Sequence, residues 1–485
     1  MNARDFKKVH LIGVGGINIS AVAKLLLASG ISVSGSDVAE NEQTKILIER
    51  GAAIAHGHGA EHVPADAELV IYSSAVPESN PERVEAKRRN IPELTNFQFL
   101  AEWFGEAKTI LVTGTHGKST TTAMLGLMLE RAKLDPTFVV GSKVPSFPEG
   151  NLRIGSPDLF VIEGDEYARH FLEFSPWGVV INNIELDHTD VFATLDEMVD
   201  AFRQLLHQMK SGGVIVANIG DVNVAKLLKE ETAWISQQSI RVIGFGEHEA
   251  QGWNVKHEMK EGWNHIELAG SGVSYRFVTH AIGSFNAFNA SGAALMAIAC
   301  GADYASIATS LELFPGIWRR FERLGELNGA TVYSDYGHHP TAVAQTLIAA
   351  HDAFPEQRII LCFQPHHRNR TKHLFFDFVP SFDTADLLVL CEIYDVAGRD
   401  AKEDEMISSQ DLVDAIIPHD ADRGVTRTVE YAKSPQEAIT ATMKLIQPGD
   451  IVIVMGAGDV DGTIRSVMLP MSSRAKSDEA EGSLS

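Results

Sequence analysis

The chain has 485 residues and a formal net charge of −23, from 41 basic and 64 acidic residues. Such an acidic protein has no overall attraction for nucleic acid or for an anionic membrane surface, and we expect neither as a partner. Its three cysteines are too few and too widely spaced for a disulfide framework or a zinc site. No apolar run reaches the roughly 18 residues of a membrane span, so we predict a cytoplasmic protein without membrane insertion.

Strand-like and helix-like segments alternate along most of the chain, which is typical of parallel sheets covered by helices. In the first unit, residues 1–105, we predict strands at 9–12, 31–34 and 69–72 and a helix at 20–28. Gly13, Gly15 and Gly16 follow the first strand, but Asn18 stands where a dinucleotide-binding loop has its third glycine. Alone, this weak motif favours NAD, with Asp37 on a ribose.

The second unit, residues 106–318, carries the strongest motif. A predicted strand at 109–112 is followed by the sequence GTHGKSTTT, which begins at Gly114, and then by a helical segment. Strand, glycine-rich loop and helix form the context of a phosphate-binding P-loop, although this loop is two residues shorter than the standard one. We predict that Lys118 reaches the outer phosphates of ATP and that Ser119 holds Mg²⁺.

The rest of the chain continues the alternating pattern. The second unit has predicted strands at 159–162, 178–181 and 213–217, a small antiparallel sheet within 252–279 and a helix at 289–299. In the third unit, residues 319–470, we predict strands at 358–363, 385–390 and 450–455 and helices at 341–350 and 435–445. The polar composition of residues 471–485 predicts a disordered tail.

The shortened P-loop resembles the ATP-binding loop of the Mur ligases, and the resemblance extends to about residue 465. In the second unit it includes VIEGDE at 161–166, NNIELDH at 182–188 and the segment with Asn286 and Asn289. In the third unit, GIWRRF at 316–321, DYGHHPT at 335–341, FQPH at 363–366 and MGAGD at 455–459 match the alanine-adding branch of this family. Together these motifs are highly specific.

The resemblance implies an α/β fold with three domains: a Rossmann-like N-terminal domain, a central P-loop ATPase domain with a mostly parallel sheet, and a Rossmann-like C-terminal domain. It implies an ATP-dependent ligase of peptidoglycan synthesis, a monomer or weak homodimer, that joins UDP-N-acetylmuramate to L-alanine through an acyl phosphate. The alternative within the family is the recycling ligase that attaches a whole tripeptide. A Rossmann oxidoreductase and a non-catalytic relative are less consistent with the P-loop and with intact Lys118, Glu163 and His188.

The resemblance also implies the site residues. Lys118, His338 and Arg370 are the expected catalytic residues, and Ser119, Glu163 and His188 the expected metal ligands. ATP is expected to contact Gly114, Thr115, His116, Gly117, Lys118, Ser119, Thr120, Asn286, Asn289, Arg320 and Asp335. The UDP-sugar is expected to contact Gly13, Gly15, Gly16, Ser36, Asp37, Ser73 and Ser74, and the amino acid Tyr336, His338, His366, His367 and Arg370.

Several positions depart from the family pattern or stay open. Phe285 replaces a histidine on the adenine side, and His367 replaces an arginine beside His366. We therefore expect Arg370 to carry most of the recognition of the amino-acid carboxylate, with His367 assisting. Asp165 and Glu166 fit either solvated loop residues or groups that support the metal ligands.

Overall fold

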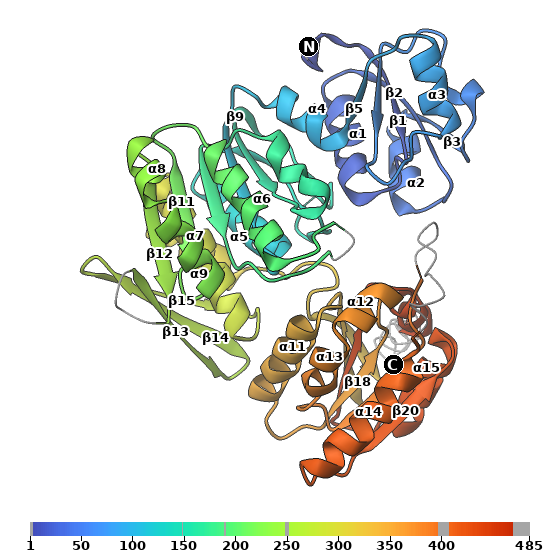
Figure 1. Ribbon diagram of the computed structural model, residues 1–485, viewed down its shortest axis with the longest axis vertical. Coiled ribbons are helices and arrows are strands. Elements are labelled where there is room, and N and C mark those ends of the chain that lie inside the picture. Colours follow the sequence, from blue (N-terminus) through green and yellow to red (C-terminus); the bar gives the residue numbers. More distant parts are fainter. Residues whose placement is uncertain (1–2, 148, 189–190, 248–251, 396–406, 469–485) are drawn as a thin grey trace, which may run out of the picture.

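The computed structural model describes residues 3–147, 149–188, 191–247, 252–395 and 407–468. It contains three separate sheets flanked by helices, so the predicted α/β class with three domains is confirmed (Figure 1). The predicted tail at 471–485 lies outside the described residues, and the boundaries near residues 105 and 318 stay our proposal. Among the described residues, no helix is both long and apolar enough to cross a bilayer.

The N-terminal domain is built on a parallel sheet. Its strands pair in the order β3 (Ala53–His56), β2 (Ser32–Asp37), β1 (Lys8–Ile12), β4 (Leu69–Tyr72) and β5 (Glu93–Thr95). The helices are η1 (Ala3–Asp5), α1 (Ile17–Ala28), α2 (Glu42–Glu49), η2 (Ala60–His62), α3 (Pro81–Arg88) and α4 (Asn96–Trp103). The strand order reverses between β1 and β4, and ligands of such sheets bind beyond the carboxyl ends of the strands at that point.

The central domain has a larger, mixed sheet. Its strands pair in the order β15 (Val273–Thr279), β14 (Trp263–Gly270), β13 (Trp253–Lys260), β12 (Arg241–Gly246), β11 (Val214–Asn218), β10 (Gly178–Ile181), β6 (Lys108–Thr113), β9 (Ser156–Glu163), β7 (Pro136–Val139) and β8 (Leu152–Arg153). The helices are α5 (Lys118–Arg131), η3 (Tyr167–Glu173), α6 (Leu195–His207), α7 (Val222–Glu230), α8 (Thr232–Gln237), α9 (Ser284–Ala299) and α10 (Tyr304–Glu312). The β13–β15 meander is antiparallel, as predicted, but it forms one edge of the large sheet and not a separate one.

The strand that leads into the P-loop is buried on both faces. Ile110 and Val112 of β6 belong to one apolar core, which they share with residues of α5 and α9. Leu111 points the other way, into a second core that contains Phe202 of α6. Because side chains alternate along a strand, helices on both faces require a continuous apolar run, as the sequence of β6 has.

The C-terminal domain repeats the parallel pattern. Its strands pair in the order β16 (Glu322–Leu327), β17 (Ala330–Asp335), β21 (Ile451–Met455), β18 (Ile359–Phe363), β19 (Leu387–Cys391) and β20 (Thr428–Ala432), and only β16 is antiparallel to its neighbour. The labelled helices are α11 (Pro340–Ala353), α12 (Arg368–His373), α13 (Phe375–Ser381), α14 (Ser409–Asp422) and α15 (Pro435–Leu445), and residues 460–468 are also helical. Cys362 and Cys391 are buried in its core.

The domains are joined in two different ways. The N-terminal and central domains share one apolar core, in which the rings of Phe104 and Phe160 stack with centroids 3.9 Å apart. In the described residues, the cores of the C-terminal domain contain no residue of the other two. The linker into this domain has positive φ at Gly316, Arg319 and Phe321 (76°, 56° and 47°). The first two domains therefore form one apolar unit, and the third is attached by a strained linker and polar contacts.

Some helices and strands have other boundaries than the sequence predicted. α1 starts at Ile17 and not at residue 20, and α9 starts at Ser284 and not at residue 289. β2 spans Ser32–Asp37, whereas the predicted strand covered 31–34. Serine, glycine and asparagine favour turns and caps by themselves, so their local preference obscured these ends. Tertiary contacts decide them: Ser32–Ser36 pair in register with Lys8–Ile12 of β1.

Candidate active site

Two adjoining cavities lie between the domains. The first, of about 830 Å³, is lined by the P-loop, by acidic residues of the central domain, by Ile17 and Asn18 of the N-terminal domain and by residues of the C-terminal domain that follow the carboxyl ends of β17, β18 and β19. The second, of about 890 Å³, is lined by Asn286, Asn289 and the linker. His116, Gly117 and Arg320 line both cavities, so the P-loop lies between the first cavity, which we call the polar chamber, and the second, which we call the adenine-side pocket.

The P-loop is held in a form that admits only glycine at position 117. Gly117 has φ +81°, and a Cβ atom there would overlap Asn289 Oδ1 and lie 2.9 Å from Asn182 Nδ2. α5 begins at the next residue, and no side chain caps its N-terminus. Its first N–H groups and the positive end of the helix dipole are therefore available to a phosphate.

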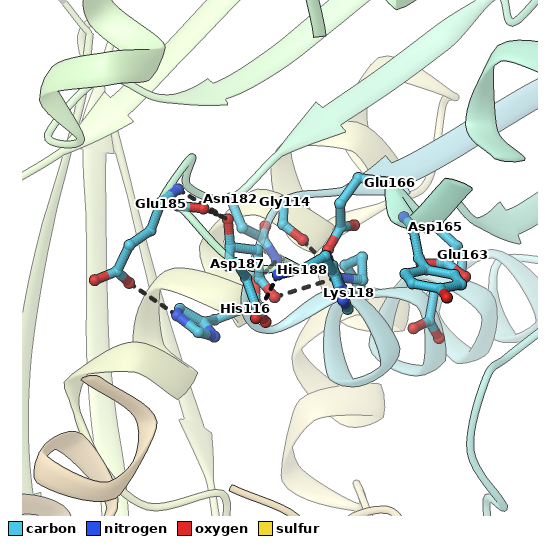
Figure 2. A network of polar contacts seen from close by, with 12 residues as sticks. Gly114, His116, Lys118, Glu163, Asp165, Glu166, Asn182, Glu185, Asp187 and His188 are labelled. Carbon is cyan, nitrogen blue, oxygen red and sulfur yellow. Dashed lines mark hydrogen bonds and ion pairs between the residues drawn. The ribbon is translucent and has the colours of Figure 1, made fainter. Parts of the chain in front are cut away.

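Lys118 is paired with a carboxylate inside the loop. Its Nζ donates to the carbonyl of Gly114 (2.8 Å) and forms an ion pair with Glu166 Oε1 (2.8 Å) (Figure 2). Burial alone lowers the pKa of Lys118, but Glu166 and Asp165 outweigh it and hold this pKa above its usual value. The lysine therefore stays charged, and a bound triphosphate competes with Glu166 for it.

The expected metal ligands fall into two neighbouring groups. Glu163 accepts hydrogen bonds from the Ser119 hydroxyl (2.9 Å) and from the Gly141 amide (2.7 Å), and burial raises its pKa. The carboxylates near His188 are Asp165 and Glu166, whose oxygens lie within 4.8 Å of each other and of an imidazole nitrogen.

Glu163 and His188 line the same cavity but follow different strands. The strand of the P-loop, β6, separates β9, which ends at Glu163, from β10, which precedes His188. Residues 165 and 166 lie beyond the end of β9 and reach His188, with Glu166 Oε1 3.5 Å from its Nε2. Asp165 lines the polar chamber, and Glu166 is fully buried and is therefore not a solvated loop residue.

Asn286, Asn289, Arg320 and Asp335, which were expected to contact ATP, line the same cavity, but the carboxylate of Asp335 is occupied by backbone amides. Asn289 donates to Asn286 Oδ1 (3.1 Å), and Asn286 donates to the carbonyl of Ile282 (2.8 Å). The two carboxylate oxygens of Asp335 accept from the backbone amides of Gly337 and Phe321 (2.7 and 2.8 Å). Asp335 therefore shapes the linker that presents Arg320.

His338 is a neutral imidazole in this cavity. Its Nδ1 lies 3.0 Å from the carbonyl oxygen of Tyr336, which can only accept, so Nδ1 carries the proton and the lone pair is on Nε2. Burial and the nearby Arg370 hold the pKa of His338 well below its usual value. The His366 ring lies beside it, with centroids 5.9 Å apart.

Arg370 and Arg368 are both already paired. Arg370 donates through Nε and Nη2 to Asp187 Oδ1 (3.0 and 2.8 Å), a contact between the C-terminal and central domains. Arg368 is at the start of α12 and pairs with Asp395 (2.9 Å). A substrate carboxylate must therefore share Arg370 with Asp187. His367, at φ 68°, lines the same cavity.

The expected UDP-sugar residues lie at the carboxyl ends of β1, β2 and β4, outside the lining of both cavities. Asp37 accepts from the Gly15 amide (2.8 Å) and so holds the glycine loop. Ser36 is fully buried and donates to Glu82 (2.8 Å), so its hydroxyl is occupied inside the domain. Gly13 lies against Ser73, where a Cβ atom would be 3.3 Å from that side chain.

Sequence reasoning missed several residues of the site. Asn18 was noted only as a departure from a motif, yet it lines the polar chamber. Glu185 and Asp187 belong to the motif at 182–188 and His339 to the motif at 335–341. Nothing in the spacing of these motifs along the chain indicates that they meet across a domain boundary. Arg319 is buried between the rings of Trp318 and Tyr336.

Comparison with known proteins covers nearly the whole chain. Residues 8–107 match the Mur ligase family catalytic domain, 112–297 the Mur ligase middle domain, and 319–458 the Mur ligase glutamate ligase domain. UDP-N-acetylmuramate–L-alanine ligase of Geobacter sulfurreducens is 35% identical, over 94% of this chain and 95% of its own length. The enzyme of the same name from Salinibacter ruber is 36% identical, over 94% and 93%.

The fold agrees with this. The UDP-N-acetylmuramate–alanine ligase of Thermotoga maritima superimposes with a TM-score of 0.78 at 24% identity, covering 96% of this chain and 99% of that one. The murein peptide ligase of Psychrobacter arcticus gives 0.68 at 22% identity, covering 96% and 98%. With three matching domains, relatives at 35–36% identity and a P-loop facing the third domain, this chain belongs to the Mur ligase family.

Proposed function

We propose that this protein uses ATP to join the carboxylate of UDP-N-acetylmuramate to the amine of L-alanine. The observation that carries the proposal is the polar chamber, in which Lys118 and the buried carboxylates face His338 and Arg370 of the third domain. The relatives that match over nearly their full length carry the name of the alanine-adding enzyme, which favours this substrate over the tripeptide of the recycling ligase.

The chemistry follows from the weakness of a carboxylate as an electrophile. A carboxylate oxygen attacks the γ-phosphorus of ATP and ADP leaves, which gives an acyl phosphate. The amine of alanine then attacks the acyl carbon, phosphate leaves, and the nitrogen loses a proton. Lys118 stabilises charge on the transferring phosphoryl group. The lone pair on Nε2 of His338 is suited to accept the proton of the attacking amine.

We propose that Mg²⁺ accompanies ATP. Ser119 and Glu163 supply hard oxygen ligands, and Asp165, Glu166 and His188 form a second set. The fit of these residues to Mg²⁺ is supported by Glu166, because its Oε2 atom is buried and has no hydrogen-bond partner among the described residues. When bound, Mg²⁺ neutralises phosphate charge. Glu163→Gln should raise the Mg²⁺ concentration needed for half-maximal rate by about 10–100-fold, whereas the exposed Glu106→Gln should not change it.

We also propose that the glycine loop of the N-terminal domain binds the UDP diphosphate. The loop lies at the point where strand order reverses, and Ile17 and Asn18 at the start of α1 line the polar chamber. The carboxylate to be activated would then lie near the P-loop.

The decisive experiment is phosphate release from ATP in the presence of UDP-N-acetylmuramate, across single amino acids and the tripeptide L-Ala-γ-D-Glu-meso-diaminopimelate. L-alanine should give the highest kcat/KM, and omission of UDP-N-acetylmuramate should abolish release. If glycine, L-serine or the tripeptide has the higher kcat/KM, the assigned acceptor is wrong. If NAD binds and UDP-N-acetylmuramate does not, the assignment of the N-terminal domain is wrong.

A further inference from the structure

The segment between Asn183 and Glu185 holds the first half of the P-loop. The Thr115 amide donates to the carbonyl of Asn183 (3.2 Å), and the His116 amide donates to the Asn183 side chain (2.8 Å). The Thr115 hydroxyl accepts from the Glu185 amide (2.8 Å) and donates to the Glu185 carbonyl (2.9 Å). A shift of this segment is therefore transmitted directly to the loop that precedes Lys118.

The side chain of Glu185 extends from this segment to two domains. Its Oε2 is 2.9 Å from Nε2 of His116 in the P-loop (Figure 2). Its Oε1 accepts from the hydroxyl of Thr341, in the first turn of α11 of the C-terminal domain, at 2.6 Å. His339, the N-cap residue of the same helix, has its Nδ1 3.9 Å from this carboxylate. One carboxylate thus contacts both the phosphate-binding loop and the third domain.

We propose that Glu185 is a positioning residue that makes the catalytic geometry of the P-loop depend on docking of the C-terminal domain. The third domain shares no apolar core with the others in the described part of the chain, so polar contacts such as this one hold it in place. When Thr341 moves away, the carboxylate loses one of its two anchors, and His116, two residues before Lys118, is held less firmly. The inference rests on the proposed function, because phosphoryl transfer is the step that needs Lys118 in place.

His116, Glu185 and His339 also have the composition of a cation site. The geometry favours hydrogen bonds over a bound cation, because both carboxylate oxygens lie at direct hydrogen-bond distance from protein groups. We call the contacts of Glu185 with His116 and Thr341 the latch. Burial raises the pKa of Glu185, but the contacts with His116 and Thr341 outweigh it, and the pKa lies below its usual value. The carboxylate is therefore charged when it makes these contacts.

The test is a double-mutant cycle with Thr341→Val and His116→Asn, read out as kcat for ligation and as affinity for a non-hydrolysable ATP analogue. Thr341→Val removes one hydroxyl at nearly constant volume, and Thr440→Val, at an exposed position of α15 in the same domain, is the matched control. Thr341→Val should lower kcat about tenfold, as expected for the loss of a hydrogen bond to a charged group. Analogue affinity should change less than about threefold, and Thr440→Val should change neither quantity.

Because both residues act through Glu185, the double variant should be no slower than the slower single variant. Independent, multiplying effects, or an unchanged kcat in Thr341→Val, would overturn the proposal. If a variant loses thermal stability, Glu185→Gln replaces it in the comparison, since the amide keeps the shape but has only one acceptor oxygen; it should lower kcat to the same degree.

Small-angle scattering with the ATP analogue separates this inference from the proposed function. The wild type should become more compact with the analogue, and Thr341→Val should do so less. If the wild type becomes more compact with the analogue but does not ligate alanine, the proposed function is wrong and the role of Glu185 in domain docking is not contradicted. If the wild type ligates alanine, and the Thr341→Val variant becomes equally compact and has the same kcat, only the proposed role of Glu185 is wrong.

Discussion

At the scale of single residues, Lys118 has both a structural and a catalytic task. Its ammonium group is the partner of Glu166, whose side chain is fully buried. The same group is placed at the start of α5, where phosphate oxygens bind. A change at Lys118 therefore affects folding energy and turnover through different partners, and the two effects can be separated.

We expect Lys118→Ala to abolish turnover and to lower the free energy of unfolding by about 3 kcal/mol, because a buried carboxylate is left unpaired. Lys118→Ala combined with Glu166→Gln should recover most of that stability and none of the activity. Urea unfolding and phosphate release measure the two quantities, and Lys229→Ala, at an exposed position of α7, is the control. Recovery of turnover in the double variant would show that Lys118 acts only through Glu166.

At the scale of elements, the turn from β6 into α5 requires a backbone that only glycine adopts without strain. Gly117 combines a left-handed φ with close contact to Asn182 and Asn289, which also line the adenine-side pocket. A side chain at this position would push the P-loop away from α9. The position of the nucleotide phosphates thus depends on packing between two elements far apart in sequence.

Gly117→Ala should raise the KM for ATP by more than about tenfold, since displacement of the loop costs several phosphate hydrogen bonds of roughly 1 kcal/mol each. Gly212→Ala is a matched control, because Gly212 also has positive φ (+73°) but a Cβ atom added there would meet no other atom within 4 Å. Both variants should lose about 1 kcal/mol of stability from backbone strain. Equal KM values for the two variants would contradict a steric role for Asn182 and Asn289.

At the scale of the whole molecule, a buried lysine fastens the N-terminal domain to the central one. Lys24 of α1 is only 1% exposed. Its Nζ donates to Gln43 (2.7 Å), to the carbonyl of Glu149 (2.8 Å) and to Asn151 (3.0 Å). Burial lowers the pKa of Lys24 to about 8, because none of these three partners is a carboxylate oxygen.

The depressed pKa of Lys24 predicts a pH dependence of stability. Between about pH 8 and 10.5 the unfolded chain keeps a proton that the folded protein has released, so the contribution of this group to stability rises with pH. From pH 7.5 to 9.5, the unfolding free energy of the wild type should gain about 2 kcal/mol relative to Lys24→Met. Urea unfolding at both pH values measures this gain, and parallel pH profiles would show that Lys24 titrates normally.

The sequence by itself determined the fold class, the family and the phosphate loop. These depend on residues that are contiguous: the apolar run at 110–112, the glycines around Lys118, and the alternation of strands and helices. It also indicated most candidate site residues, because in parallel sheets the residues just after the strands gather at one edge. Local signals were weaker where serine, glycine or asparagine begin an element, as in β2 and α9.

Only the tertiary structure decided which of these residues are partners. The carboxylates beside His188 come from the chain beyond β9 because β6 lies between β9 and β10. Arg370 is paired with Asp187, and Thr341 with Glu185, because the third domain docks on the central one. Each of these pairs joins residues more than 150 positions apart in the sequence. Such contacts depend on strand order and domain placement, and no spacing along the chain encodes them.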